Sequence, residues 1–334
     1  MGTRSSRVSS PFYCLLPKHC CLLYTLTMPL LVTKNLSKHV CGTWALWDVS
    51  LEINSGEIVG ILGRSGSGKT MLASVLAGLE EPTSGSIVTG DPDMKPFRIG
   101  VALSTPAYAP DLTVYENLDM FAMAWGMPAK RRAKDVPFMM ERLKLSDWRS
   151  ARAGNLSSGE LARMEIARGL LADSPLLVID SLLDSLDPEV FESLWDHLLD
   201  LKRSLGKSFV VLTGSGKIAE VCHRIAVISR GRIAFLGRPE DFRRLAGEDV
   251  VVLGDMSNPM TRHRIQERLS VVIQEEDGFL SFRVANGERI VGELLSEFGN
   301  EMSCVYLKRP TLEDALDVLA HGGSSVTAGT GKKL

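Results

Sequence analysis

The sequence predicts an α/β fold on a parallel sheet, followed by a small α+β unit, and three observations support this. First, four short apolar segments alternate with helical stretches, as in a sheet that is buried on both faces: Glu57–Leu62, Pro175–Asp180, Ser208–Thr213 and Arg224–Ser229. Second, a glycine-rich loop joins the first of these strands to a helical segment. Third, the order of elements changes after about residue 246.

The N-terminal segment, residues 1–27, is apolar but contains Pro17, Lys18 and His19. A membrane span needs about 20 mostly apolar residues without such breaks. We therefore expect this segment to be a disordered or non-native extension, with Met28 as an alternative start and a membrane anchor as the remaining alternative.

Residues 28–246 are predicted to form one large unit. It opens with two strands, 30–33 and 45–53, before the turn that precedes Glu57. The stretch from about 113 to 172 is mainly helical in pattern. Helix breaks are expected at three residues of this stretch: Gly126, Pro128 and Pro137.

After residue 246 the predicted order is β-α-β-β-α-β, which indicates a small ferredoxin-like unit over residues 247–321. The expected strands are 249–253, 270–275, 279–285 and 302–308. The expected helices are 258–269, 288–299 and a final one at 311–320. Residues 322–334 are rich in Gly, Ser and Thr without an apolar period, so we expect a disordered tail.

The charges are nearly balanced: 38 basic and 40 acidic residues give a net charge of −2. No broad positive field is available to attract a phosphate backbone. Nucleic acid is therefore not an expected partner.

The glycine-rich loop matches the phosphate-binding pattern G-x-x-x-x-G-K-[ST] in full, between a strand and a helix. Its residues are Gly63, Arg64, Ser65, Gly66, Ser67, Gly68, Lys69 and Thr70. Gly66 and Gly68 permit backbone angles that let consecutive N–H groups face phosphate oxygens. Lys69 is expected to reach the β- and γ-phosphates of a nucleotide, and Thr70 to ligate Mg²⁺.

Two further features bear on this site. Asp180 ends an apolar strand, where a carboxylate can hold Mg²⁺ through water; a turn or helix-cap role is the alternative. Gly214–Lys217 is a partial second match, but it lacks the leading glycine and the hydroxyl residue after lysine, so we discount it.

Several motifs, in order and at matching spacing over about 30–240, resemble those of ABC transporter ATP-binding subunits. They are Asp111–Leu118, the signature-like Asn155–Glu160, Leu176–Pro188, Arg224–Ile228 and Gly231–Ile233. The tail is similar to an extension on exporter subunits, and Pro310–Leu316 resembles its last helix.

This resemblance implies a P-loop NTPase fold with a helical subdomain at about 104–173. It also implies binding of ATP and Mg²⁺, a membrane permease as partner, and a cytoplasmic location on the inner face of the cell membrane. Subunits of this family dimerise head to tail, with Asp187 expected at the dimer contact. The residues expected to meet the partner's ATP are Leu156, Ser157, Ser158, Gly159 and Glu160, although Glu160 is better explained as a first-turn helix glutamate.

The sequence departs from the family at four positions. Ser181 stands where the catalytic glutamate is expected, Gly214 where the switch histidine is expected, and Ser104 near the position of a glutamine. Leu36 aligns with the aromatic residue that stacks on adenine, with Trp44 the nearby aromatic. A serine cannot accept a proton from water as a carboxylate can, so we expect ATP binding with slow or absent hydrolysis.

An altered site beside a nearly intact signature suggests the inactive half of a heterodimer of ATP-binding subunits. The alternatives are a non-transporting nucleotide sensor or scaffold with the same fold, and an active homodimer that uses Asp184 as its base.

Overall fold

The computed structural model describes residues 29–89, 98–103, 107–254, 259–276 and 279–321. The expectations for residues 1–27, for Ser104 and for 322–334 lie outside these residues. Among the residues described, no helix has the length and apolar character needed to cross a membrane.

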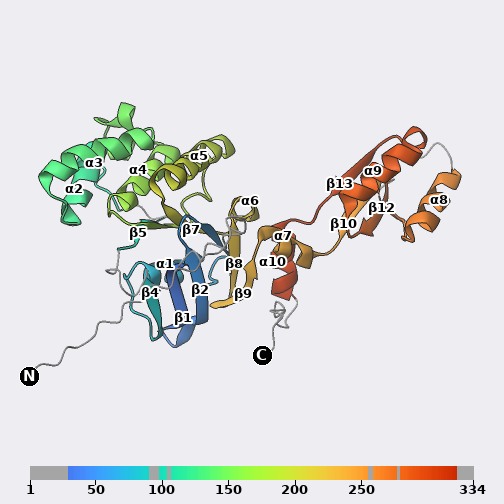
Figure 1. The fold of residues 1–334 in the computed structure, drawn as a ribbon, viewed down its shortest axis with the longest axis horizontal. Coiled ribbons are helices and arrows are strands. Elements are labelled where there is room, and N and C mark those ends of the chain that lie inside the picture. Colours follow the sequence, from blue (N-terminus) through green and yellow to red (C-terminus); the bar gives the residue numbers. More distant parts are fainter. Residues whose placement is uncertain (1–28, 90–97, 104–106, 255–258, 277–278, 322–334) are drawn as a thin grey trace, which may run out of the picture.

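A six-stranded sheet in the order β5-β6-β7-β3-β8-β9 forms the centre of the larger part of the molecule (Figure 1). Its strands are β3 (Ile58–Leu62), β5 (Gly100–Leu103), β6 (Leu176–Asp180), β7 (Ser208–Thr213), β8 (Arg224–Ser229) and β9 (Arg232–Gly237). All neighbouring pairs are parallel except β8 and β9. The parallel α/β prediction is confirmed, and it omitted β5. Because the strands are parallel, β3, β6 and β7 end at one edge of the sheet.

A second sheet, antiparallel and in the order β2-β1-β4, lies beside the first. It contains β1 (Pro29–Val40), β2 (Thr43–Asn54) and β4 (Ser84–Thr89), and the first two strands are longer than predicted. Helix α1 (Lys69–Leu76) contributes Leu72 and Val75 to the core that this sheet shares with β3.

Four longer helices lie on the other side of the six-stranded sheet from the second sheet. They are α2 (Val114–Ala124), α3 (Ala129–Arg142), α4 (Ser158–Leu170) and α5 (Pro188–Leu205). The predicted breaks at Gly126 and Pro128 separate α2 from α3, and Gly126 has a φ of +81°. The predicted break at Pro137 is wrong, because this proline lies inside α3. Proline removes the hydrogen bond to the carbonyl four residues earlier. Here that residue is the exposed Ala133, where water can bind the carbonyl instead.

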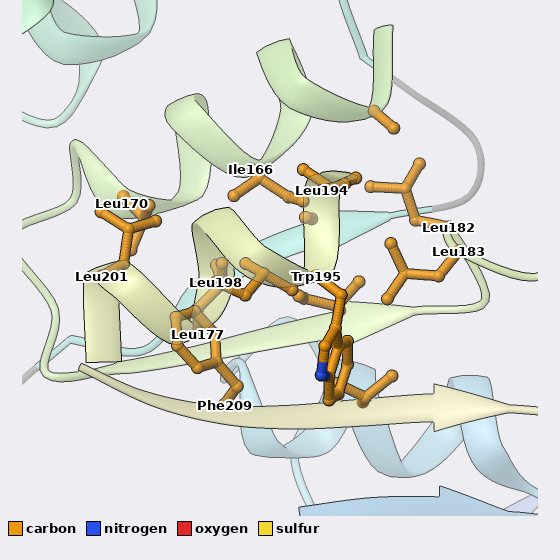
Figure 2. Packing of buried hydrophobic residues seen from close by; sticks show 14 of the residues in the cluster. Ile166, Leu170, Leu177, Leu182, Leu183, Leu194, Trp195, Leu198, Leu201 and Phe209 are labelled. Carbon is orange, nitrogen blue, oxygen red and sulfur yellow. The ribbon is translucent and has the colours of Figure 1, made fainter. Parts of the chain in front are cut away.

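Helices α4 and α5 pack against β6 and β7 through close-packed apolar side chains (Figure 2). Leu194, Leu198 and Leu201 project from successive turns of α5, as expected for the buried face of an amphipathic helix. Leu182 and Leu183, which follow β6, also point into this core. The loop after β6 is therefore anchored by two buried leucines.

The C-terminal region contains a small antiparallel sheet in the order β11-β12-β10-β13. Its elements are β10 (Asp249–Leu253), α8 (Pro259–Leu269), β11 (Gln274–Glu276), β12 (Phe279–Val284), α9 (Gly287–Phe298) and β13 (Val305–Lys308). The expected order of strands and helices is present, but β11 and β13 begin later than predicted. Ser270, with a φ of +52°, directly follows α8 and delays the start of β11.

The last helix, α10 (Leu312–His321), does not pack on this small sheet. Its buried residues Leu312, Ala315 and Leu316 belong to the main core and lie near α6 (Gly216–Glu220) and α7 (Pro239–Arg243). The predicted unit 247–321 therefore does not contain the packing partners of its own last helix.

Removing a large side chain from the core in Figure 2 should destabilise the nucleotide-binding part of the chain. Leu198 is fully buried, so Leu198→Ala should lower the free energy of unfolding by about 2–5 kcal/mol through lost burial and a residual cavity. The matched control is Leu79→Ala, because Leu79 is 63% exposed. Equal shifts of the urea midpoint in both variants would contradict this packing.

Candidate functional site

The glycine-rich loop connects β3 to α1 by a tight turn. Gly66 and Gly68 have φ values of +74° and +108°, in the region that favours glycine. A Cβ on Gly68 would also lie 2.6 Å from the carbonyl oxygen of Ala45 in β2. Close contact with β2 and the left-handed backbone thus both require glycine here.

Lys69 folds back over this loop. Its Nζ donates to the carbonyl oxygens of Gly63 at 2.7 Å and Arg64 at 3.1 Å. Burial lowers the pKa of Lys69, while the carboxylates of Asp184 and Asp180 act in the opposite direction. Two of its three N–H donors are used, so the third can bind a phosphate oxygen.

Asp180 is buried at the end of β6 and accepts a hydrogen bond from Ser181 Oγ at 3.2 Å. Ser181 has a φ of +53°, and its N–H donates to the carbonyl oxygen of Leu212 in β7 at 2.9 Å. The position expected to hold a catalytic carboxylate thus holds a hydroxyl that is bonded to Asp180.

The side chain of Asp184 has hydrogen-bond partners that the sequence did not predict. One oxygen of its carboxylate accepts from Thr213 Oγ1, and the other accepts from the N–H of Gly214 at 2.8 Å. It therefore connects the loop after β6 to the switch position after β7. This contact joins residues about thirty positions apart, so no local motif could reveal it.

These elements enclose a cavity of about 440 Å³ at the edge of the sheet. Its lining combines the phosphate loop with the altered positions: Ser65, Gly66, Gly68, Lys69, Thr70, Met71, Ser181, Asp184 and Gly214. The structure therefore brings five residues of the phosphate loop together with Ser181, Asp184 and Gly214, whereas Asp180 is not part of this lining.

A second cavity, of about 950 Å³, lies between α7 and the small sheet. Its four arginines are each ion-paired with a carboxylate: Arg243–Glu220, Arg244–Asp241, Arg289–Glu293 and Arg309–Glu288. No phosphate loop borders this cavity, so the smaller cavity is the better nucleotide site.

The signature-like residues lie at the start of α4. Ser157 caps the helix by accepting from the N–H of Glu160, whose Oε2 accepts in turn from the N–H of Ser157 at 2.7 Å. Glu160 thus forms a capping box, as its first-turn position suggested. Ser158 is exposed, whereas Gly159 is buried beside Val190. None of these residues lines the cavity of the phosphate loop.

Three other expectations can be placed. Leu36, which aligns with the aromatic residue that stacks on adenine, is fully buried and offers no surface to a base. Trp44 is 42% exposed and precedes Ala45, whose carbonyl touches the phosphate loop. Asp187 is exposed at the start of α5, and its side chain makes no capping hydrogen bond.

The hydrogen-bond donors around the cavity fit a nucleoside triphosphate. They are a lysine and a left-handed glycine loop at a helix N-terminus. Ser67 Oγ of the same loop is buried and has no hydrogen-bond partner. No cluster of three or more His, Cys, Asp or Glu residues suits a metal among the residues described. A magnesium ion held mainly by phosphate, hydroxyl and water needs no such cluster.

Comparison with known proteins supports this interpretation. A family profile described as ABC transporter matches residues 46–183. The methionine import ATP-binding protein MetN of Clostridioides difficile is 30% identical over 67% of this chain and 76% of its own length. MetN 2 of Rhodococcus jostii is 31% identical over 85% and 87%. The Nod factor export ATP-binding protein I of Cupriavidus metallidurans is 32% identical over 64% and 73%.

Solved structures of ATP-binding cassettes are similar to this chain in fold. The ATP-binding cassette MJ0796, in a dimeric post-hydrolysis state bound to ADP and Pi, is 25% identical with a TM-score of 0.56, covering 63% of this chain and 98% of that chain. The ADP conformation of the cassette MJ1267 is 26% identical with a TM-score of 0.58, covering 66% and 95%. Sequence, fold and site thus agree that this chain belongs to the ATP-binding subunits of ABC transporters.

Proposed function

We propose that the phosphate loop of this chain binds MgATP for an ABC transporter. The observation that carries this proposal is the cavity in which Lys69, Thr70 and the loop backbone meet the ends of β6 and β7. Loop N–H groups and Lys69 would hold the phosphates. Thr70 and Asp180 would hold Mg²⁺, which when bound neutralises charge on the phosphate oxygens.

We further propose that this site turns ATP over slowly. Ser181 carries a hydroxyl instead of a carboxylate, so it has no base to offer to a water molecule. This hydroxyl donates to Asp180. Gly214 has no side chain to contact a phosphate. Loss of a general base alone lowers a rate by about 10²–10⁴-fold.

The signature segment supports a role at a partner's site. Leu156, Ser157, Ser158 and Gly159 lie at a helix N-terminus, which favours anions, yet they do not line the cavity of their own chain. Asp187 is exposed and available for a contact between subunits. We propose that this chain pairs with a second ATP-binding subunit, completes that subunit's active site, and docks on a permease at the inner face of the membrane.

The direction of transport is proposed from one feature. Pro310–Leu316 resembles the last helix of exporter subunits, which favours export. Two of the relatives named above are methionine import proteins and one is an export protein, so the relatives do not favour export. Uptake and efflux assays of the assembled transporter would decide the direction.

One observation favours a second candidate, an active ATPase with Asp184 as its base. The Asp184 carboxylate lines the cavity beside Lys69, although both of its oxygens already accept hydrogen bonds. Among the residues that line this cavity, Asp184 carries the carboxylate, so it is the group that could replace the missing glutamate.

Nucleotide binding should depend on Lys69. Lys69→Ala should weaken binding of a fluorescent ATP analogue by about tenfold or more, because a charge-assisted hydrogen bond to phosphate is lost. The matched control is Lys217→Ala, from the partial second motif, which should bind as the wild type does. Equal affinities for Lys69→Ala and the wild type would contradict the site.

Steady-state ATPase assays separate the two candidates. We expect Asp184→Asn to retain a slow turnover and Ser181→Glu to raise it, toward the gain of about 10²-fold that a positioned base supplies. Complete loss of turnover in Asp184→Asn would instead show that Asp184 is the base.

The signature proposal predicts unequal effects in a mixed dimer with the co-purified second subunit. Ser158→Glu in this chain should lower the ATPase rate of the mixed dimer by about tenfold or more, because it places like charge beside the partner's phosphates. Lys69→Ala should lower the rate less. Equal losses, or no stimulation by this chain, would refute the asymmetric arrangement.

A further inference from the structure

We propose that α10 positions the two loops that border the nucleotide cavity, through the carboxylates of Glu313 and Asp317. The proposal rests on the proposed function of that cavity. It gives the C-terminal part of the chain a direct mechanical connection to nucleotide binding, although the small sheet itself lies apart from α1, which follows the phosphate loop (Figure 1).

The apolar side of α10 holds the helix on the nucleotide-binding part. Leu312 and Ala315 are fully buried and Leu316 is 9% exposed. They pack in one cluster with Phe242 of α7 and Ile218 of α6. Burial of this kind is the main source of helix docking energy, so α10 has a defined position beside α6.

Glu313 contacts the switch loop. Its Oε1 accepts from the N–H of Gly216 at 2.7 Å, two residues after Gly214. A Cβ on Gly216 would lie 2.3 Å from Glu313 Oε2, so an alanine at this position would displace the exposed carboxylate. A hydrogen bond to an ionised carboxylate is roughly twice as strong as one between neutral groups. The carboxylate also occupies the amide that the partial second motif would offer to a phosphate.

Asp317 contacts the phosphate loop. It lies four residues after Glu313, on the same face of the helix, and forms an ion pair with Arg64. Both side chains are more than half exposed, so the pair contributes little to stability. Its contribution is to position Arg64, whose carbonyl oxygen accepts from Lys69.

Two connecting segments of the chain join the nucleotide-binding part and α10 to the small sheet. The chain enters β10 shortly after α7 and returns from β13 to α10, so both connections lie beside the nucleotide-binding part. Residues 309–311 join β13 of the small sheet directly to the start of α10, which carries Glu313. By linkage, nucleotide binding must in turn stabilise the docked α10.

The test uses the full chain and measures the Kd for a fluorescent ATP analogue. Glu313→Ala should weaken binding by about fivefold or more, while Glu313→Gln, which keeps the acceptor oxygen, should retain most of the affinity. The matched control is Glu297→Ala, which breaks an exposed ion pair with Arg268 on the small unit and should leave Kd unchanged.

A double-mutant cycle makes the test specific. Gly216→Ala should weaken binding because its Cβ displaces Glu313, and adding Glu313→Ala should weaken it no further. Hydrogen exchange should also show α10 amides protected by the nucleotide in the wild type and less so in Glu313→Ala. If Glu313→Ala does not fold, Asp317→Asn and Gly216→Ala carry the same comparison.

The outcomes separate the two proposals. No binding by the wild type would refute the proposed function and this inference with it. Binding by the wild type with an unchanged Kd in Glu313→Ala and Gly216→Ala would overturn only the role of α10.

Discussion

The buried ammonium of Lys69 is the constraint on which the rest of the site depends. A cation removed from water needs polar partners, since an isolated buried charge is costly. Here the carbonyls of Gly63 and Arg64 supply them, and the carboxylates of Asp180 and Asp184 favour the charged form. The loop must therefore keep its turn, and β6 must end where its carboxylate acts on the lysine.

The loop after β6 shows how catalytic positions change while the fold is retained. Ser181 stands where the family's catalytic glutamate is expected, yet Leu182 and Leu183 bury their side chains in the core between α5 and the sheet. Asp184 then reaches across to Thr213 and Gly214. The same segment thus has a hydroxyl at Ser181 and a carboxylate three residues later, in contact with the switch position.

The C-terminal part has two different roles in the fold. The small sheet has its own core with α8 and α9, whereas α10 is packed into the core of the nucleotide-binding part. The segment between α7 and α10, which contains the small sheet, therefore forms an insertion whose two ends are adjacent. Such an arrangement lets a peripheral unit act on a distant cavity through one helix, without any residue of the small sheet entering the cavity.

The amino-acid sequence by itself determined the features that depend on neighbours along the chain. The alternating strands, the Gly63–Thr70 turn and the first-turn role of Glu160 all follow from local pattern and capping chemistry. Pro137 was the local exception, because an exposed turn of α3 accommodates it. Only the tertiary structure decided which of Leu36 and Trp44 is exposed, that Asp184 holds Gly214, and that α10 leaves its neighbouring sheet to hold Arg64 and Gly216. These are contacts between residues far apart in the chain, and their partners are set by packing in three dimensions.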